Sequence, residues 1–309
     1  MLAYLFNIYN KHMKLNNKKF IAAVSGGPDS MALLDKFRKN IVGVCHVNYH
    51  KRQDSNIDAK LVVDYCSDHS IPVSIYEVDK NLYKKAKQHN FQTLAREIRY
   101  EFFVQCAKQF KCKNLLVAHN INDFIETALM QQNRKSLNFF YGIKPINTYK
   151  TLTIYRPLIN EFKSDLEKYC QSNGIAYAID SSNSSDVYER NRVRKQLAKL
   201  SKSQLLKLYK QFVARNNKQA QLEKQVDKVL QSWSKTNYSV KYFASIKQPL
   251  VNSLIYVYLK KNKIININYN KIKLVRDFIV SKKSNNSLRL EEGIKLVKKD
   301  KRVKVVKEQ

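Results

Sequence analysis

Ser25-Gly26-Gly27-Pro28-Asp29-Ser30 directly follows the apolar run Phe20–Val24 and opens a helix-like segment, Asp29–Lys39. Two adjacent glycines let a backbone turn sharply and approach a ligand closely. Amide N–H groups at the start of the helix would then face an anion, helped by the positive end of the helix dipole. Ser25 and Ser30 add hydroxyl donors. We therefore predict that these six residues form a phosphate-binding loop.

The residue pattern of this loop indicates which kind of phosphate ligand it would bind. It has neither the G-x-G-x-x-G pattern of a dinucleotide-binding turn nor the Gly-Lys-Ser/Thr ending of a Walker loop. Because it carries no lysine, it fits the pyrophosphate end of ATP bound together with a metal ion that Asp29 would help to hold. The alternative is a plain turn in which serine and aspartate cap the helix.

Around the loop, the first half of the chain alternates short β-branched runs with longer helix-like segments. The predicted strands are Phe20–Val24, Ile41–Val47, Pro72–Val78 and Asn114–Ala118, and the predicted helices are Asp29–Lys39, Ile57–His69, part of Gln88–Phe110 and Asn122–Gln132. This alternation predicts an α/β fold with a parallel sheet wrapped by helices. Ligands of such sheets bind at the carboxyl ends of the strands. We therefore expect Ser25–Ser30, His46–Asn48 and His119–Asp123 at one edge.

The second half of the chain is predicted to be less regular and then mainly helical. Thr151–Tyr155 is predicted as an edge strand and Ile175–Ile179 as a further strand, and helix resumes at Glu189. We expect a catalytic domain over residues 1–182 and a second region over 183–309, with the boundary near Ser181–Asp186. That region is predicted to be helical over 183–235 and to form a small α+β unit, ending in a hairpin, over 236–309.

The net charge of +32 is extreme and uneven. Residues 1–182 carry 26 Lys and Arg against 16 Asp and Glu, whereas residues 183–309 carry 31 against 9. This asymmetry predicts a polyanion-binding module, most simply for nucleic acid, attached to a more neutral domain. A membrane surface is one alternative. The other is an AT-rich genome, which would enrich Asn, Ile, Tyr and Lys without any partner.

The five cysteines form no C-x-x-C pair, which favours a reducing cytosol over a disulfide or zinc framework. The N-terminal residues show no signal-peptide pattern. The most apolar later stretch, Leu250–Leu259, is far shorter than the ~20 residues that span a bilayer. We expect a cytoplasmic protein without a membrane partner.

The Ser25–Ser30 loop resembles the signature of the PP-loop ATP pyrophosphatases. That resemblance implies a domain that uses ATP to adenylate a carbonyl-type oxygen and releases pyrophosphate. Within this superfamily, Ala118–Thr127 is similar to the A-H-H-x-D-D-x-x-E-T segment of the lysidine synthases, and His119, Asp123, Glu126 and Thr127 match it. Asn120 and Asn122 depart from that pattern and remove one charge. Carboxylates three residues apart share a helix face, so Asp123 and Glu126 could hold Mg²⁺ or an ammonium group; the alternative is a pair that only complements the helix dipole.

Three further blocks resemble the lysidine synthases in the same order. Leu94–Tyr100 is similar to the family's A-R-x-x-R-Y helix, where Arg96 and Arg99 would clamp phosphate unless they form a solvated charged face. His46-Val47-Asn48 is similar to an H-V-N segment, although His46 could be a buried structural histidine. The third block comprises Arg156-Pro157-Leu158 and the run from Asp180 to Arg194, in which Arg190, Asn191 and Arg194 would face RNA phosphate.

The resemblance implies ligation of L-lysine to C2 of the wobble cytidine of tRNA(Ile) with a CAU anticodon, with ATP and Mg²⁺ as cofactors. It implies catalytic roles for Asp29, Arg96, His119, Asp123 and Glu126, with Asp29 and Asp123 as metal ligands. ATP would be bound by Ser25–Ser30, His46 and Asn48, and tRNA by Arg99, Arg190, Asn191 and Arg194. A homodimer is compatible with the sequence, which does not fix the oligomeric state. The rivals are a tRNA thiolase, a non-catalytic RNA-binding protein and an amidotransferase synthetase.

Overall fold

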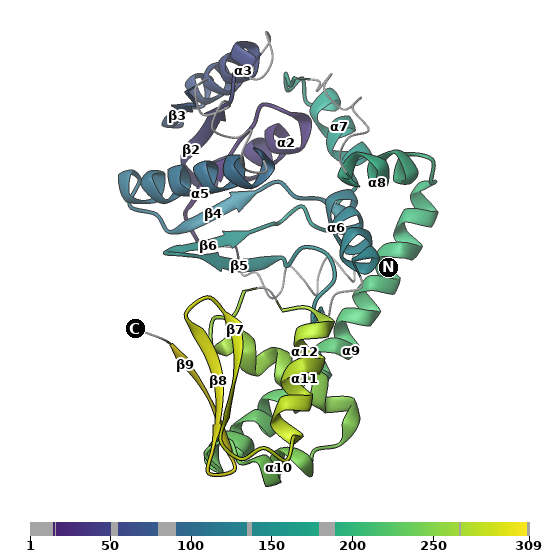
Figure 1. The fold of residues 1–309 in the computed structure, drawn as a ribbon. Helices are drawn as coiled ribbons and strands as arrows, with labels where there is room; N and C mark the ends of the chain where they lie inside the picture. Colours follow the sequence, from purple (N-terminus) through teal and green to yellow (C-terminus); the bar gives the residue numbers. More distant parts are fainter. Residues whose placement is uncertain are drawn as a thin grey trace. The chain divides into compact units, whose positions relative to one another are not determined.

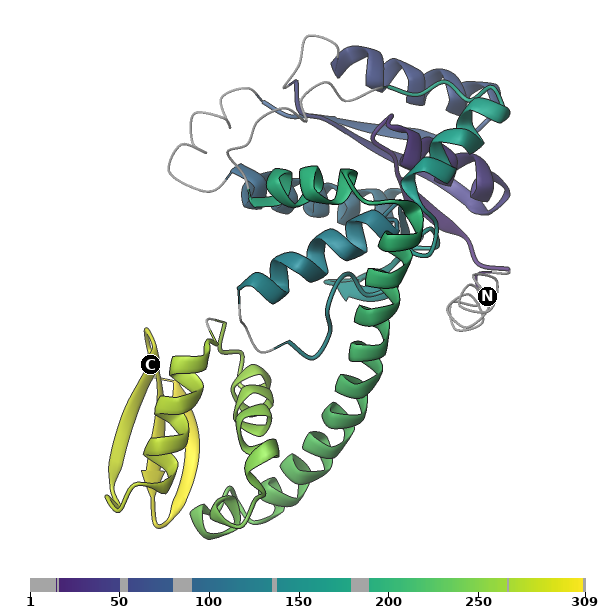
Figure 2. The same cartoon turned by 90° about the vertical axis from the view of Figure 1, so that its right-hand side faces the viewer.

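The computed structural model describes residues 15, 17–50, 55–79, 91–134, 138–178, 189–265 and 267–307, which fall in two compact units (Figure 1). The first unit comprises Met1–Thr127 and Gly142–Tyr209, and the second comprises Ala128–Tyr141 and Lys210–Gln309. The boundary expected near Ser181–Asp186 lies outside the described residues. Two helices, α6 and α9, begin in the first unit and end in the second, and Figure 2 shows α9 as one continuous helix.

The first unit follows the predicted alternation of strands and helices. Its elements are β1 (Phe20–Ala23), α2 (Pro28–Phe37), η1 (Arg38–Asn40), β2 (Ile41–Asn48), α3 (Ser55–Asp68), β3 (Val73–Glu77), α5 (Phe91–Gln109), β4 (Asn114–Val117), α6 (Ile121–Asn133), β5 (Ile146–Tyr149), β6 (Leu152–Tyr155), α7 (Lys163–Ser172), α8 (Glu189–Ala198) and α9 (Lys202–Lys235). The predicted α/β class is confirmed.

The six strands form one sheet in the order β3-β2-β1-β4-β6-β5. β1 pairs in parallel with both β2 and β4, so the direction in which the chain winds reverses at β1. In open α/β sheets, the carboxyl ends of the strands at such a reversal form the ligand crevice. The loops that leave β1 and β4 contain Ser25–Ser30 and His119–Asn120, which places both predicted segments at this crevice.

Two strand predictions were wrong. Thr151–Tyr155 was expected at the edge, but β6 lies inside the sheet, parallel to β4 and antiparallel to β5, which forms the edge. Leu152, Ile154 and Tyr155 are buried, as an inner strand requires. Residues 175–178 of the predicted strand Ile175–Ile179 form no strand, because the Ala178 amide donates to the carbonyl of Gly26, 2.9 Å away.

Alternate residues of the strands supply the two cores of the first unit. Phe20 and Ala22 of β1 pack in a cluster with residues of α2, α3 and α7, whereas Ile21 packs in a second cluster with residues of α5. This alternation follows from the two-residue period of a strand. Helices thus cover both faces of the sheet (Figures 1 and 2), and the crevice at its carboxyl edge lies between fixed walls.

The second unit is built around the buried Trp233 of α9. Its other elements are α10 (Val240–Ala244), α11 (Gln248–Lys261), α12 (Tyr269–Val280), β7 (Asn286–Glu291), β8 (Ile294–Lys299) and β9 (Arg302–Lys307). The strand region predicted as a hairpin is an antiparallel three-stranded sheet in the order β7-β8-β9. Buried Lys298 donates to the carbonyl oxygens of Phe278 and Ser281 and so closes the end of α12. In the part of the chain that the structure describes, no helix is long and apolar enough to cross a membrane.

Candidate active site

Gly26 makes the turn of the predicted phosphate loop possible. Its φ is +87°, a conformation that other residues rarely adopt. A Cβ at this position would also lie 3.0 Å from the carbonyl oxygen and 3.2 Å from the Cα of Asp58. Position 26 therefore requires glycine for the fold itself.

Gly27 has a different reason to lack a side chain. Its φ of −76° is open to any residue, and a Cβ there would meet only Ser25 Oγ, at 3.8 Å. Gly27 is the N-cap of α2; because Pro28 has no N–H and the Ser30 and Met31 amides donate to the Gly27 carbonyl, the amides left at the helix start to face an anion are those of Gly27 and Asp29. The missing side chain thus leaves room for an anion at the helix start. Ser30 closes the turn, because its hydroxyl donates to the Gly27 carbonyl (2.9 Å) and accepts from the Ser25 amide (3.1 Å).

A cavity of about 870 Å³ opens beside this loop. Its walls come from the carboxyl ends of β1, β2 and β4 and from α2, α5, α6, α7 and α8. The predicted site residues that line it are Ser25, Gly27, Pro28, Asp29, Ser30, Arg99, His119, Asp123, Glu126, Asn191 and Arg194. The structure therefore brings most of the expected nucleotide, catalytic and tRNA-contacting residues to one cavity within the first unit.

His46 and Asn48 do not line the cavity. Alternation along β2 directs Cys45 and Val47 toward it and places these two residues on the opposite face. His46 is buried with its Nδ1 2.9 Å from the Val24 carbonyl oxygen, and Asn48 donates to Asn56 of α3 over 3.1 Å. Burial lowers the pKa of His46. His46 thus has the geometry of the structural histidine considered as the alternative.

Asp29, at the start of α2, and Asp123, at the start of α6, line the same cavity. Burial and, after it, the negative charge of Asp123 raise the pKa of Asp29 to about 7. Asp29 Oδ1 is buried and has no hydrogen-bond partner in the structure. Burial also raises the pKa of Asp123. Two carboxylates that line one cavity, one of them with an unsatisfied oxygen, form a site that a cation would stabilise.

The two asparagines that depart from the expected motif have clear structural roles. Buried Asn120 accepts hydrogen bonds through its Oδ1 from the amides of Asn122 (2.8 Å) and Asp123 (3.2 Å). Asp123 Oδ2 in turn accepts from the Asn120 amide at 3.0 Å, which completes a reciprocal cap at the start of α6. Asn122 Oδ1 accepts from the Lys163 amide at 3.2 Å and ties α6 to α7.

Lys163 and Glu167 of α7 also line the cavity, and sequence reasoning missed both. The positive charge of Lys163 acts on Asp29 in the direction that lowers its pKa, and Lys163 Nζ lies 4.0 Å from Glu167 Oε1 on the same helix. Lys163 thus brings from another helix the cation that the Ser25–Ser30 loop lacks. The spacing of Lys163 from the loop along the chain carries no signal of this contact.

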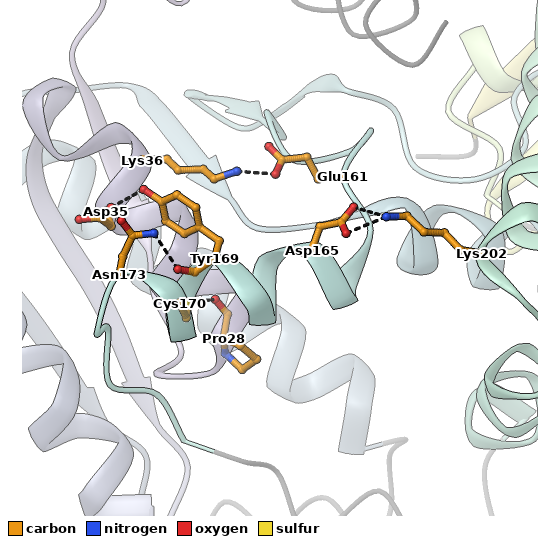
Figure 3. A network of polar contacts seen from close by, with 9 residues as sticks. All are labelled: Pro28, Asp35, Lys36, Glu161, Asp165, Tyr169, Cys170, Asn173 and Lys202. Carbon is orange, nitrogen blue, oxygen red and sulfur yellow. Dashed lines mark hydrogen bonds and ion pairs between the residues drawn. The ribbon is translucent and has the colours of Figure 1, made fainter.

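α7 is fastened to α2, and Figure 3 shows this network. Tyr169 donates to Asp35 Oδ2 at 2.5 Å, and the Cys170 thiol donates to the carbonyl of Pro28 at 3.4 Å. Lys36 pairs with Glu161 just before α7. Because Pro28 belongs to the phosphate loop, these contacts, made mainly by the last turn of α7, hold that helix against the loop.

Glu126 is buried and ion-paired with two arginines of α8. Arg190 Nε donates to its Oε1, and Arg194 Nε donates to its Oε2 at 2.7 Å. The carboxylate is 3% exposed, whereas the arginine side chains are 39% and 45% exposed. The sequence predicted two separate roles here, a catalytic one for Glu126 and tRNA binding for both arginines, and the structure joins these residues into one contact between α6 and α8.

Arg96 and Arg99 both lie beside Tyr100 on α5. The Arg96 guanidinium lies 4.5 Å from the centre of the Tyr100 ring and that of Arg99 5.9 Å from it. Of the two, Arg99 lines the cavity and Arg96 is exposed outside its wall. Both charges act on His119 in the direction that lowers its pKa. They therefore lie close enough to the cavity to attract an anionic ligand.

His119 ends the loop after β4 and accepts a hydrogen bond at Nδ1 from Arg156 Nε, 2.8 Å away. Burial lowers the pKa of His119 well below its usual value, and the charge of Arg156 lowers it further. The R-P-L segment was noted in the sequence without a role, and this contact gives one to Arg156.

Comparison with known proteins identifies the family to which the chain belongs. A model of the PP-loop domain matches residues 3–201. The tRNA(Ile)-lysidine synthase of Ureaplasma parvum is 41% identical over 284 residues, which is 91% of this chain and 85% of that protein. The tRNA(Ile)-lysidine synthase of Malacoplasma penetrans is 41% identical over 88% of this chain and 92% of its own. This chain belongs to the tRNA(Ile)-lysidine synthase family. The resemblance read from the Ser25–Ser30 and Ala118–Thr127 segments is thereby confirmed.

Lysidine synthases share their fold with other PP-loop enzymes. The U34-tRNA thiolase NcsA of Methanococcus maripaludis superposes with a TM-score of 0.51 at 16% identity, covering 70% of this chain and 79% of that one. At this identity the likeness concerns the fold alone. The lysidine synthase family therefore rests on the sequence relatives, and the PP-loop architecture rests on both comparisons.

Proposed function

We propose that the chain ligates L-lysine to C2 of the wobble cytidine of a tRNA(Ile) with a CAU anticodon, through an adenylated tRNA, with release of AMP and pyrophosphate. The observation that carries the proposal is that Asp29 and Asp123 line one cavity beside the Ser25–Ser30 loop, in a chain that belongs to the lysidine synthase family. A phosphate loop, a paired carboxylate site and a basic wall are the parts that adenylation of an RNA base requires.

The phosphate loop would bind the pyrophosphate end of ATP. The helix start at Gly27 offers amides and open space, and Lys163 offers a cation at the same place. His46 and Asn48, expected to bind ATP, point away from this cavity, and we do not include them in the nucleotide site.

Asp29 and Asp123 are the residues that would hold Mg²⁺. Carboxylate oxygens are ligands that Mg²⁺ prefers, and the ion commonly binds one or two carboxylates together with substrate phosphates. The unpartnered Oδ1 of Asp29 fits this, as does the lack, among the described residues, of a protein-only cluster of three or more His, Cys, Asp and Glu ligands. When bound, the ion neutralises the negative charge that grows on the pyrophosphate.

The ammonium group of lysine needs a carboxylate that binds it and then accepts a proton. Making this amine neutral at pH 7 costs about 4.6 kcal/mol in water. Glu126 already pairs with two arginines, so we assign this role to Asp123, whose raised pKa makes it the better base. Glu126 then positions α8 against α6.

The arginines in and beside the cavity would bind the phosphate of the adenylate and the phosphates of the RNA backbone. Arg99 and Arg194 line the cavity, and Arg96 lies next to it. A guanidinium group binds phosphate through paired donors. We propose that Arg96 and Arg99 serve the adenylate phosphate, and that Arg190, Asn191 and Arg194 reach the tRNA backbone. The basic second unit, with its sheet β7-β8-β9, would extend this contact.

A tRNA thiolase with this fold would need reactive thiols, as in a cysteine with a lowered pKa. All five cysteines are buried and unpaired here. Burial raises the pKa of the Cys45, Cys66 and Cys170 thiols. These observations support lysine rather than sulfur as the group that is added.

The decisive experiment is incubation of the chain with ATP, labelled L-lysine and a tRNA(Ile) transcript, followed by digestion and identification of the labelled nucleoside. We expect one labelled cytidine derivative and equal amounts of AMP and pyrophosphate. A transcript with uridine at the wobble position is the matched control and should remain unlabelled. Label at another nucleoside, or AMP formation without RNA labelling, would overturn the proposal.

A further inference from the structure

The contact between Arg156 and His119 fixes where the imidazole carries its proton. Arg156 Nε lies 2.8 Å from His119 Nδ1. A guanidinium group has donors and no acceptor, so Nδ1 must be the acceptor and cannot carry hydrogen. The other ring nitrogen then carries the proton. We propose that Arg156 holds His119 as a neutral Nε2–H tautomer, and that His119 serves the reaction as a hydrogen-bond donor and not as a proton acceptor.

Arg156 is itself held firmly. It is 3% exposed, and its Nη1 donates to the carbonyl of Lys144 (2.8 Å) and to Asn147 Oδ1 (2.5 Å). Its backbone amide donates to the carbonyl of Pro145 at 2.9 Å. Because these acceptors lie at the start of β5 and just before it, the arginine cannot turn away from His119 without breaking bonds at the sheet edge.

The surroundings of His119 also oppose a positive charge on its ring. Arg156 follows β6, Arg96 and Arg99 lie on α5, and Arg190 lies on α8, and all four charges lower the pKa of His119. Asp123 and Glu126 of α6 are the acidic groups on the neighbouring helix, and Glu126 is neutralised by its two arginines. These charges therefore favour the neutral form of the imidazole, in line with the hydrogen bond that its Nδ1 accepts from Arg156.

A neutral imidazole that donates from Nε2 suits an oxygen that gains negative charge during a reaction. His119 lines the cavity beside the phosphate loop. Under the proposed function, its partner would be the O2 atom of cytidine or a phosphate oxygen of the adenylate. His119 then donates a hydrogen bond and transfers no proton, which leaves the proton of lysine to Asp123. Arg156 is a positioning residue that acts through His119.

The tautomer can be read directly by ¹⁵N NMR of the side chains of the six histidines. His119→Gln removes one signal and so assigns it. We expect a neutral Nε2–H pattern that does not change between about pH 5 and 8. A protonated ring or an Nδ1–H tautomer within that range would overturn the assignment. This measurement needs neither tRNA nor turnover, so it stands or fails independently of the proposed function.

The kinetics of AMP formation then show whether His119 acts as a hydrogen-bond donor or as a general base. The amide nitrogen of glutamine can replace Nε2–H but cannot accept a proton, so His119→Gln should retain activity within about tenfold, whereas His119→Ala should lose about 10²–10³-fold, the effect of removing one oxyanion donor. Equal losses for both variants would contradict the donor role. If AMP forms with neither variant nor the parent chain, the proposed function fails and the tautomer result remains.

Arg156 supplies the second pair of variants. Arg156→Met frees Nδ1 and should add a histidine ionisation to the pH profile of AMP formation, while Arg156→Lys keeps a donor and should not. Thermal unfolding of both variants checks that the sheet edge has survived. A profile that is identical in Arg156→Met and the parent chain would show that Arg156 does not set the state of His119. Should Arg156→Met not fold, the comparison of His119→Gln with His119→Ala still decides the donor role.

Discussion

The buried carboxylate of Glu126 on α6 forms an ion pair with Arg190 through one oxygen and with Arg194 through the other. A buried carboxylate that keeps one arginine is still neutralised, whereas one that loses both is left as an unpaired buried charge. The pairing joins residues 64 and 68 positions apart in the chain. It makes α8 part of the wall of the cavity.

Replacing the two arginines should therefore destabilise the protein non-additively. We expect Arg190→Ala and Arg194→Ala to lower the free energy of unfolding by about 1 kcal/mol each. The double variant should lose about 3–5 kcal/mol, because Glu126 is then unpaired. Urea unfolding of the three variants provides the measurement, and Glu126→Gln in the double-variant background should restore most of the loss. Strict additivity would show that the carboxylate does not depend on the pair.

The same variants test contact with tRNA. If Arg190 reaches a phosphate, Arg190→Ala should reduce the slope of log affinity against log salt by about one unit. Filter binding or fluorescence anisotropy over a salt series measures this slope. Loss of stability with an unchanged slope would assign Arg190 to Glu126 alone.

Asp29→Asn should stabilise the protein while it removes activity. The pKa of Asp29 is about 7 in the folded state, against 3.8 for the ordinary group. Between these two values the folded protein retains a proton that the unfolded chain has lost, so this carboxylate lowers stability as the pH rises from 4 through 7. At pH 8 the variant should gain of order 2–4 kcal/mol, and near pH 4 almost nothing.

The matched control is Asp35→Asn. Hydrogen bonds from Tyr169, Tyr65 and Arg38 hold the pKa of Asp35 below its usual value, so its charged form stabilises the fold and the control should lose stability at pH 8. Pyrophosphate release by Asp29→Asn should fall sharply at an almost constant affinity for tRNA. A large loss of tRNA binding would contradict the assignment of the loop to ATP.

Gly26→Ala should reduce the stability of the protein, whereas Gly27→Ala should reduce its affinity for ATP. The first forces a side chain into a left-handed backbone against Asp58 and should cost of order 1–3 kcal/mol of stability. The second leaves the fold intact and fills the space in front of the α2 amides, so it should raise KM for ATP by about tenfold or more. Thermal unfolding and ATP-dependent AMP formation distinguish them. A Gly27→Ala enzyme with a normal KM would mean that the helix start does not bind phosphate.

Lys163→Gln should weaken ATP binding by about 10–100-fold, the value of one charged hydrogen bond. Lys163→Arg keeps the charge and should retain most of the affinity. The expected loss is specific to nucleotide, so lysine and tRNA should bind as before. Equilibrium binding of a non-hydrolysable ATP analogue measures the effect. Equal affinity in the Gln and Arg variants would show that the charge at position 163 is irrelevant.

The sequence predicted the local parts of this site because their signals are local. An apolar run, a glycine turn and a helix start occupy Phe20–Lys39 without interruption, and the structure contains them in that order. The sheet edge was predicted wrongly because β5 has few buried residues and its pairing with β6 is set by a short turn at Lys150.

Contacts between distant segments were not predictable from spacing. Arg156 meets His119 across 37 positions, and nothing in either segment specifies the partner. The role of Asn122 likewise depends on the contact between α6 and α7, whereas the cap made by Asn120 is local to the start of α6. The position of His46 outside the cavity lining was also not predicted, since alternation along β2 decides which face a side chain occupies.

Asn122 has one further consequence for the order in which ligands arrive. With an amide at this position, where the related motif has an acid, the acidic groups that act on Asp29 beside the loop are Asp123 and Glu167. Asp123 Oδ2 already accepts from the Asn120 amide, and Glu167 lies 4.0 Å from the ammonium group of Lys163. So few ligands hold a divalent ion weakly. We therefore expect the ion to bind together with the nucleotide, as a preformed metal–ATP complex, and not to the enzyme before ATP binds.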